Sequence, residues 1–220
     1  MKDLPFQEFT DFLYSRLTQP LPGQQAQFQM APLSRRQPSR ASVEAKDCRE
    51  AGVLALFYPN ETGCPQLLLT KRPEAMNKHA GQVAFPGGRR ESGESLEETA
   101  LRETEEEVRI AAEHVDLLGA LTSLYIPPSN FCVHPFVGVI DYTPDLSVRT
   151  EEVADIFGVS PDRLTTPEAR MTQTTHLAGT ERDIPYFAFN GEVVWGATAM
   201  MLAELAAVLD PDVLTWESLL

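Results

Sequence analysis

The sequence predicts an α+β protein in which a mixed sheet is flanked by helices. Strand-like and helix-like segments follow each other irregularly over the 220 residues, without the steady strand–helix alternation of a parallel α/β sheet. Asn190-Gly191 lies between two apolar runs and is a strong signal for a hairpin turn. The segment GATAMMLAELAAVL (196–209) predicts a closing helix that is apolar enough to lie on the core. A chain of this length can form one good core with appendages.

The first 50 residues differ in composition from the rest. Apolar residues recur at helical spacing in residues 4–17, which predicts a short amphipathic helix that ends at the segment QPLPG. Residues 19–50 are rich in Gln, Pro, Ser and Arg, and we expect an extended connector there. The chain is therefore divided into an N-terminal helix with its connector (1–48) and a main domain (49–220).

From residue 51 onwards, short apolar runs alternate with turn signals. Runs of this kind, bounded by Gly, Pro and Asn, are typical of strands. The first two runs flank PNETGC, which predicts a hairpin over residues 51–72. The other strands that we expect are a short one before a Gly-rich turn (81–88), three at 115–124, 132–141 and 153–160, and a hairpin at 184–196.

The formal net charge of −14 bears on the class of partner. Nucleic-acid binding rests on Lys and Arg that neutralise phosphates, so this charge argues against it. A small phosphorylated ligand, held by a local basic patch or by divalent cations, remains compatible with the charge. The basic cluster of Arg35, Arg36 and Arg40 is interpreted as a contribution to solubility.

The three cysteines, Cys48, Cys64 and Cys132, are widely spaced and odd in number. They form neither a metal motif nor a disulfide framework, which predicts a reducing cytoplasm. No apolar run reaches the roughly 18 residues of a membrane span. The N-terminal residues contain acids and no apolar block, unlike a signal peptide. We therefore expect a cytoplasmic protein without a membrane partner.

Acidic residues are concentrated in FPGGRRESGESLEETALRETEEEV, after a Gly-Gly pair and two arginines. Ser95, with a Glu three residues later, has the spacing of a capping box and predicts a helix start. At roughly 100° per residue, Glu103, Glu106 and Glu107 share about a third of the helix circumference. An adjacent stripe faces the core and consists of Leu96, Ala100, Thr104 and Val108.

The acids therefore lie beside the buried face of this helix. A carboxylate at the margin of a core is costly unless it is paired or bound to a metal. Oxygen-rich sites select hard cations such as Mg²⁺ or Mn²⁺. Arg102, within the acidic run, is placed to pair with a carboxylate and hold its rotamer. On their own, these acids are equally compatible with a solvated helix face.

The spacing favours the metal site, because it resembles the Nudix box. That family pattern is Gly, five residues, Glu, seven residues, Arg-Glu, an aliphatic residue, any residue, Glu-Glu, any residue, Gly and an aliphatic residue. Thr104 stands at the first aliphatic position, and Arg109 replaces the final Gly, so the helix need not end in a left-handed Gly turn. Six positions match: Gly88, Glu94, Arg102, Glu103, Glu106 and Glu107.

The resemblance implies a role for each matched residue. The Gly88 carbonyl would be a backbone metal ligand, Arg102 would orient a glutamate, and Glu94 would brace the loop and helix together. Glu103, Glu106 and Glu107 would be the metal-binding glutamates. The resemblance also implies an αβα sandwich, here with an added N-terminal helix, and an enzyme that uses Mg²⁺ or Mn²⁺ to cleave a nucleoside diphosphate linked to another group.

A general base is needed to deprotonate the attacking water. The segment RTEEVADIF offers Glu151, Glu152 and Asp155 after a strand. Glu152 is favoured because this segment looks like the loop in relatives where an acid precedes the next short strand. Glu103 is the rival base. The alternative interpretation of these acids is the polar start of a helix.

A second resemblance concerns the substrate. LLLTKRPEAMNKHAGQVAFPGG is similar to the signature of the coenzyme A pyrophosphatase branch, and VVWGATAMML is similar to the start of the last helix in that branch. Pro73 and Asn77 depart from the signature, and the loss of an Arg at Asn77 removes a bidentate phosphate donor. The residues that match are Leu68, Leu69, Thr70, Arg72, Gly81, Phe85, Pro86, Gly87 and Gly88.

Coenzyme A is an ADP derivative with a further 3′-phosphate and a long pantetheine arm. Arg72, Lys71, Lys78 and His79 are placed to meet its phosphates, and Gly81 would let the backbone come close. The alternatives are solvent exposure for the two lysines and a loop-bracing hydrogen bond for His79.

The sequence thus predicts a divalent-metal-dependent pyrophosphohydrolase. The favoured substrate is coenzyme A or acyl-CoA, cut to 3′,5′-ADP and a 4′-phosphopantetheine product. One alternative is another nucleoside diphosphate derivative, such as ADP-ribose or a dinucleotide. A second is a non-catalytic module that senses a nucleotide. A homodimer is compatible with an N-terminal segment that packs on a partner subunit.

Overall fold

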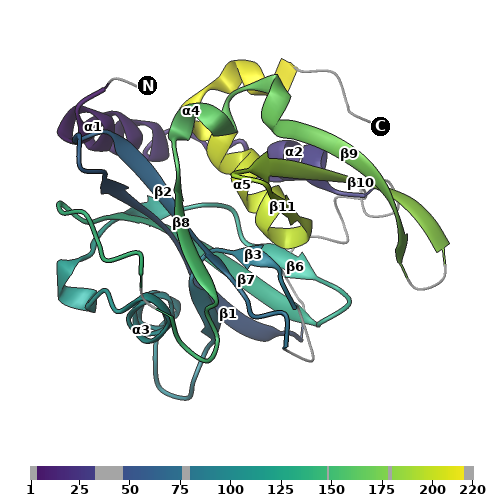
Figure 1. Cartoon of the computed structure of the whole chain (residues 1–220), viewed down its shortest axis with the longest axis horizontal. Coiled ribbons are helices and arrows are strands. Elements are labelled where there is room, and N and C mark those ends of the chain that lie inside the picture. The colour runs from purple at the N-terminus through teal and green to yellow at the C-terminus, as the bar shows by residue number, and fades with distance from the viewer. Residues whose placement is uncertain (1–3, 33–46, 76–79, 148, 178–179, 216–220) are drawn as a thin grey trace.

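A mixed sheet with helices on both faces forms the described part of this protein (Figure 1). The computed structural model describes residues 4–32, 47–75, 80–147, 149–177 and 180–215. The helices in these ranges are α1 (Phe6–Leu17), α2 (Gly23–Gln27), α3 (Leu96–Val108), α4 (Pro161–Leu164) and α5 (Gly196–Leu209), with short turns η1 (Phe28–Met30), η4 (Ala112–His114), η5 (Pro167–Ala169) and η6 (Pro211–Thr215). The strands are β1 (Arg49–Pro59), β2 (Pro65–Lys71), β3 (Val83–Ala84), β4 (Gly87–Arg89), β5 (Asp116–Ala120), β6 (Leu124–Ile126), β7 (Phe131–Val139), β8 (Asp155–Val159), β9 (Arg170–Leu177), β10 (Thr180–Phe189) and β11 (Glu192–Trp195).

The larger sheet is built on the parallel pair β1 and β7, in which Arg49 lies opposite Phe131 and Phe57 opposite Val139. The other described pairings in this sheet are antiparallel: β2 and β4 with β1, β3 and β8 with β2, and β5 and β6 with β7. The predicted mixed sheet is therefore confirmed.

Strand β1 is buried on both faces because helices cover both. Leu54 and Leu56 belong to a core with Ala100 of α3, whereas Ala55 and Phe57 belong to a second core with α5. Figure 1 shows α3 and α5 on opposite sides of the sheet. This arrangement confirms the predicted αβα sandwich.

The N-terminal segment contributes to the second core. The predicted first helix is confirmed as α1, and Phe9 and Leu13 on it are fully buried. The expectation of an extended connector over residues 19–50 is wrong where the structure describes it, because α2 and η1 fold within it and β1 begins at Arg49. Burial of Ala26 against the core outweighs the Gln-rich composition there. Arg35, Arg36 and Arg40 lie outside the described residues.

A smaller three-stranded sheet, in the order β11–β10–β9, extends from the body (Figure 1). The predicted hairpin turn is confirmed, since Asn190 and Gly191 have positive φ angles of 52° and 84° between β10 and β11. Strand β9 was not predicted, because MTQTTHL has few apolar residues. Its three threonines, which favour strands, were the available signal.

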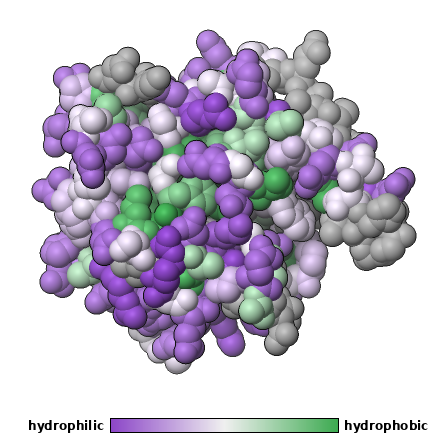
Figure 2. Space-filling model, viewed as in Figure 1, coloured by the Kyte–Doolittle hydropathy of each residue, from purple (hydrophilic) through white to green (hydrophobic). Residues whose placement is uncertain are grey.

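Figure 2 shows hydrophilic residues over most of the face in view, with apolar residues gathered near its centre. Large hydrophobic side chains that are exposed include Tyr14, Tyr142, Met171 and Val193. Within the described ranges, no helix combines the length and the apolar character that crossing a bilayer requires.

The prediction that the cysteines form no disulfide is wrong. Cys48 and Cys132 are joined, with 5.8 Å between their Cα atoms. The cause is the parallel register of β1 and β7, which places Glu50 opposite Cys132 and brings Cys48 alongside. Cys64 is free. Sequence spacing could not show this pairing, because the two cysteines are 84 positions apart and meet only through that register.

Candidate functional site

Helix α3 forms one side of the candidate site. The predicted capping box is confirmed: the backbone N–H of Glu98 donates to Ser95 Oγ at 3.1 Å, and the backbone N–H of Ser95 donates to Glu98 Oε2 at 2.6 Å. Ala100, Thr104 and Val108 of the predicted core-facing stripe are buried. The polar Thr104 is tolerated there because its hydroxyl donates to the carbonyl of Ala100.

The end of α3, which the sequence left open, is a left-handed turn. Arg109 adopts the left-handed conformation, with φ 60° and ψ 32°, although it is not glycine. Its backbone N–H donates to the Glu105 carbonyl. The change in chain direction at Arg109 places Ile110 in the core. Burial of Ile110 offsets the roughly 1 to 2 kcal/mol that this conformation costs a residue with a Cβ. The helix therefore ends in a left-handed turn although Arg109 replaces the family's Gly.

Arg102 links α3 to the loop that precedes it. Its Nε donates to Glu94 Oε2 at 3.1 Å and its Nη2 to Glu94 Oε1 at 3.0 Å. The Arg102 guanidinium, followed by the backbone N–H of Glu91, lowers the pKa of Glu94 to about 2. Arg102 Nη2 also lies 3.3 Å from the Arg89 carbonyl. The loop and the helix are therefore joined as one rigid unit.

The same guanidinium reaches two of the predicted metal-binding acids. Arg102 Nη1 lies 3.0 Å from Glu103 Oε1 and 3.3 Å from Glu106 Oε2. The Glu103 side chain is 16% exposed, whereas that of Glu106 is 60% exposed. Arg102 therefore orients Glu103 at the margin of the core and pairs with Glu106 in solvent.

Gly88 lies directly against Glu103. A Cβ added to Gly88 would be 2.4 Å from the carboxyl carbon of Glu103, so a side chain there would displace this carboxylate. Burial raises the pKa of Glu103, opposed by Arg102 and supported by repulsion from Glu106 and Glu152. The structure thus brings the backbone of Gly88 and an oxygen-donor side chain together.

Glu107 is the most deeply buried acid of this site, with 5% of its surface exposed. Its Oε2 accepts a hydrogen bond from the Gly87 N–H at 3.3 Å. Burial raises its pKa to about 7, with Arg72 lowering it and Glu103 and Glu152 raising it further. A carboxylate with so few partners for its charge is strongly favoured to bind a cation.

Arg72, after β2, lies between α3 and the loop before β8. Its Nη2 is 3.8 Å from Glu107 Oε1, and its Nη1 is 3.9 Å from Glu152 Oε2. Asp155, the first residue of β8, pairs with Arg149. The structure therefore brings Glu152, the sequence-favoured base, to the candidate site, with its side chain 60% exposed.

Other residues of the predicted substrate segment are placed less directly. Gly81 has a positive φ of 65°, and a Cβ there would lie 2.5 Å from Glu74 Oε1, so the close approach that it permits is to Glu74. Lys71 Nζ pairs with Glu192 Oε1 of β11 at 2.9 Å. Lys78 and His79 lie outside the described residues.

The donor types at this site fit a hard divalent cation. Glu103 and Glu107 are partly or largely buried carboxylates, and repulsion from Glu103 raises the pKa of Glu107, a repulsion that a divalent cation would relieve. In the arrangement seen here, no three or more His, Cys, Asp or Glu side chains of the described ranges are grouped to hold a metal ion. Glu106 is directed to Arg102 instead. To lie beside Glu103 and Glu107 at a shared cation, its carboxylate would have to rotate away from that arginine.

Sequence reasoning missed two residues beside this unit. Glu50, at the start of β1, pairs with Arg90, in the loop after β4, at 2.6 Å between Oε2 and Nη1. Neither residue is distinguished in sequence from ordinary surface charges, because the contact depends on the antiparallel pairing of β1 and β4.

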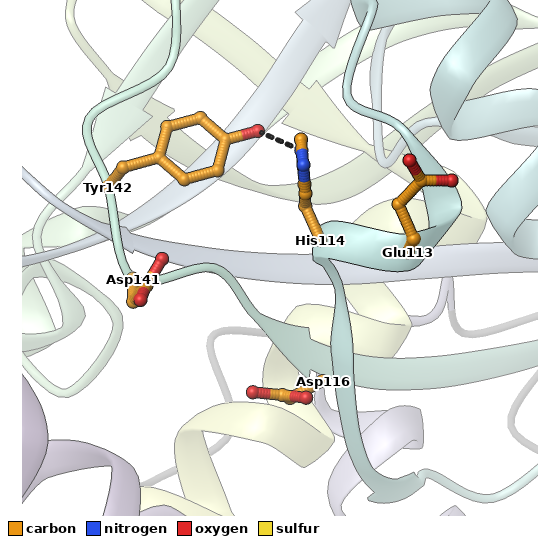
Figure 3. Close-up of a pocket in the computed structure, with 5 residues that line it drawn as sticks. All are labelled: Glu113, His114, Asp116, Asp141 and Tyr142. Carbon is orange, nitrogen blue, oxygen red and sulfur yellow. Dashed lines mark hydrogen bonds between the residues drawn. The ribbon is translucent and has the colours of Figure 1, made fainter.

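A separate hollow follows the end of α3 (Figure 3). Its lining contains none of the predicted site residues. The Tyr142 hydroxyl lies 3.3 Å from His114 Nδ1 across it. The lining residues are Glu113, His114, Asp116, Asp141 and Tyr142.

Comparison with known proteins decides the family. The NUDIX domain model matches residues 49–177, which include both α3 and the loop of Glu152. The chain belongs to the Nudix family. Nudix hydrolase NudL of Yersinia enterocolitica is 36% identical over 171 residues, covering 77% of this chain and 86% of the relative. Nudix hydrolase 3 of Caenorhabditis elegans is 36% identical over 187 residues, covering 78% of each chain.

Solved structures of the Nudix family are similar in part. The MutT/nudix family protein from Enterococcus faecalis has a TM-score of 0.48 and 17% identity, covering 84% of this chain and 70% of its own. The family match and the relatives establish this chain as a Nudix pyrophosphohydrolase, an enzyme that acts on pyrophosphate bonds of nucleotide derivatives.

Proposed function

We propose that this Nudix hydrolase cleaves the pyrophosphate bond of coenzyme A or acyl-CoA with Mg²⁺ or Mn²⁺ as cofactor. The products are 3′,5′-ADP and (acyl-)4′-phosphopantetheine. The observation that carries the proposal is the position of Arg72, within 4 Å of both Glu107 and Glu152. The positively charged Arg72 belongs to the segment that resembles the coenzyme A branch, and it lies beside Glu107 of the Nudix box.

The residues that would hold the metal are the Gly88 carbonyl and the carboxylates of Glu103, Glu106 and Glu107. A divalent ion at these oxygens supplies charge neutralisation of the diphosphate and a water of lowered pKa. Arg102 keeps Glu103 in place through its bonds to Glu94 and Glu103. The Glu103 carboxylate is thus held in one orientation, whereas that of Glu106 would first rotate away from Arg102.

Glu152 is the proposed general base. Its carboxylate is solvent-exposed and lies across Arg72 from Glu107, a position from which it can accept a proton from water attacking phosphorus. Arg72 would donate to a phosphate oxygen and is then drawn away from the two acids. Glu103 is the alternative base, because burial raises the pKa of its carboxyl.

The choice of coenzyme A rests on the segment that contains Arg72, Lys78, His79 and Gly81. These residues would contact the phosphates and the approaching backbone of the substrate. ADP-ribose or a dinucleotide is the alternative substrate class. A non-catalytic sensor is disfavoured by Glu107, since burying this carboxylate is costly and brings no benefit without a bound cation.

A substrate panel with product identification tests this proposal. Coenzyme A, acetyl-CoA, ADP-ribose and a diadenosine polyphosphate are incubated with the enzyme and Mg²⁺ or Mn²⁺, with EDTA as control. We expect the largest kcat/KM for a coenzyme A substrate, 3′,5′-ADP as product, and no turnover in EDTA. A larger kcat/KM for ADP-ribose would overturn the substrate assignment. Tight binding without any phosphorus-containing product would overturn catalysis itself.

A further inference from the structure

We propose that Glu50 and Arg90, anchored by the Cys48–Cys132 disulfide, position the Glu94–Arg102 pair and make the hydrolytic rate sensitive to the redox state of that disulfide. This inference rests on the proposed function of the α3 glutamates. Arg90 acts here as a positioning residue, because its contacts are to Glu50 and to the backbone of the loop.

Arg90 makes three contacts that join β1 to the loop before α3. Its backbone N–H donates to the Glu50 carbonyl at 3.0 Å. Its Nη1 donates to Glu50 Oε2 at 2.6 Å, and its Nε donates to the Glu94 carbonyl at 2.7 Å. Glu94, whose carboxylate holds Arg102, is thus connected through its carbonyl and Arg90 to Glu50 at the start of β1.

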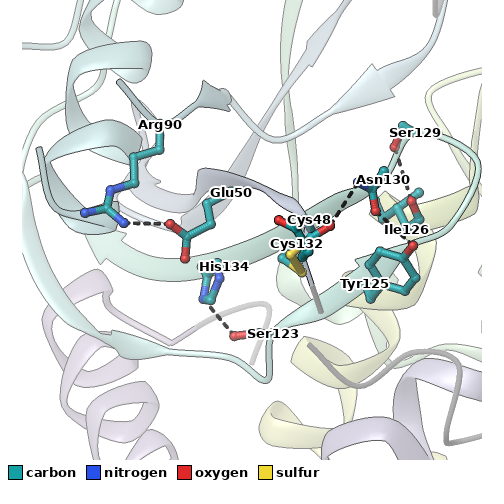
Figure 4. Close-up of a disulfide and its surroundings, with 11 residues drawn as sticks. Cys48, Glu50, Arg90, Ser123, Tyr125, Ile126, Ser129, Asn130, Cys132 and His134 are labelled. Atoms are coloured by element: carbon teal, nitrogen blue, oxygen red, sulfur yellow. Dashed lines mark hydrogen bonds and ion pairs between the residues drawn. A yellow bond between two sulfur atoms is a disulfide. The ribbon is translucent and has the colours of Figure 1, made fainter. Parts of the chain in front are cut away.

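The start of β1 is in turn fixed to β7. Glu50 lies opposite Cys132, and Cys48, two positions earlier, is bonded to Cys132. Figure 4 shows Glu50 between Arg90 and the disulfide. The Asn130 side chain also donates to the Asp47 carbonyl at 3.1 Å. A covalent tie therefore holds the strand end from which Glu50 reaches Arg90.

Exposure indicates what this connection contributes. The Arg90 and Glu50 side chains are 39% and 40% exposed, and ion pairs of this kind add little to stability. The effect on the reaction is larger, since a misplacement of a catalytic group by about 1 Å can lower the rate 10²-fold. We therefore expect the pair to affect turnover more than folding.

Reduction by a dithiol breaks the anchor. The dithiol gives two electrons and two protons, the bond between Cys48 Sγ and Cys132 Sγ breaks, each sulfur becomes a thiol, and the dithiol closes to its own disulfide. The end of β1 then loses its covalent tie and is held by its hydrogen bonds to β7, its pairing with β4 and the contact of Arg49 with the Phe131 ring. Glu50 gains freedom to move, and the hold of Arg90 on the Glu94 loop weakens.

The first test is a double-mutant cycle with Glu50→Gln, Arg90→Gln and the double variant. We expect each to lower kcat by about tenfold, with KM and the thermal midpoint little changed. The double variant should lose no more than Arg90→Gln alone, because that variant already removes the contact to Glu50 as well as the contact to the Glu94 carbonyl. Arg163→Gln is the matched control, since this arginine of α4 donates to the Ala188 carbonyl of β10. Arg90→Gln with the kcat of Arg163→Gln overturns the positioning role.

The second test compares oxidised and dithiothreitol-reduced enzyme in a Cys64→Ser background, which removes the free thiol. Oxidised enzyme should contain no titratable thiol. Reduction should expose two thiols and lower kcat several-fold at saturating Mg²⁺, and Cys48→Ser should match the reduced form under both conditions. Equal kcat in both redox states, or two thiols without reductant, overturns the redox sensitivity. An oxidised enzyme that hydrolyses no diphosphate at all would instead overturn the proposed function.

Discussion

Arg102 and Glu94 form two parallel hydrogen bonds, from Nε to Oε2 at 3.1 Å and from Nη2 to Oε1 at 3.0 Å. The remaining nitrogen, Nη1, is left to contact Glu103 at 3.0 Å. A lysine keeps the charge but cannot span both oxygens of Glu94 and still reach Glu103. We expect Arg102→Lys to lower kcat by about 10- to 100-fold while the protein stays folded. Steady-state kinetics and circular dichroism check this, and wild-type kcat would contradict it.

Glu107→Gln tests the metal role most directly. The amide keeps the shape and can still accept from the Gly87 N–H, but it removes the negative charge that a divalent cation requires. We expect activity to fall by orders of magnitude with folding intact. Glu105→Gln is the matched control, because Glu105 is an exposed residue of the same helix. Similar activity of the two variants would remove Glu107 from the site.

The raised pKa of Glu107 predicts a pH-dependent gain in stability for the same variant. Burial raises this pKa from 4.5 to about 7, so the folded state binds the proton more tightly than the unfolded state. The charged form therefore costs stability above pH 7, and that cost fades as the pH falls towards 4.5. In EDTA at pH 8, the free energy of unfolding of Glu107→Gln should exceed that of the wild type by about 1 to 3 kcal/mol. Urea unfolding should show this difference vanish near pH 4.5.

Local signals made parts of this fold predictable from sequence. The capping box fixes the start of α3 within a few residues of chain, and Asn190-Gly191 fixes a hairpin through backbone preference alone. Helix α2 could not be found this way, because its Gln-rich sequence folds through packing against α5. The disulfide depends on a strand register that no local pattern of Cys48 or Cys132 contains.

The candidate site divides in the same manner. The pairing of Arg102 with a carboxylate was predictable from its place within the acidic run, and the family resemblance assigned Glu94 to bracing the loop and the helix. The contacts of Arg72 with Glu107 and Glu152 join segments that are distant in the chain. Only the assembled sheet brings β2, α3 and the loop before β8 together.

Arg72→Gln should impair substrate binding. It removes the cation that lies beside Glu107 and Glu152, so a bound diphosphate loses a charge-assisted partner. We expect KM to rise by about tenfold or more with a smaller change in kcat. Arg72 also lowers the pKa of Glu107, so the variant should need a higher pH for full activation by Mg²⁺.

Lys71→Gln is the matched control for Arg72. Lys71 is adjacent in sequence but pairs with Glu192 on β11, so its removal should raise KM less than the removal of Arg72. Initial rates over a range of substrate concentrations compare the two variants. Equal increases in KM would show that Arg72 has no special place in binding.

Arg109→Gly tests the left-handed end of α3. Arg109 has φ 60°, a conformation that costs a residue with a Cβ about 1 to 2 kcal/mol and glycine much less. The substitution also removes the positive charge of Arg109 near the helix C-terminus, which stabilises the folded state by about 0.3 to 1 kcal/mol. Arg109→Ala loses the same charge but keeps the strain. We therefore expect the free energy of unfolding, measured with urea, to be about 1 kcal/mol higher for the Gly variant than for the Ala variant. The kcat should be unchanged in both. Equal free energies of unfolding would mean that residue 109 is not held in the left-handed conformation in solution.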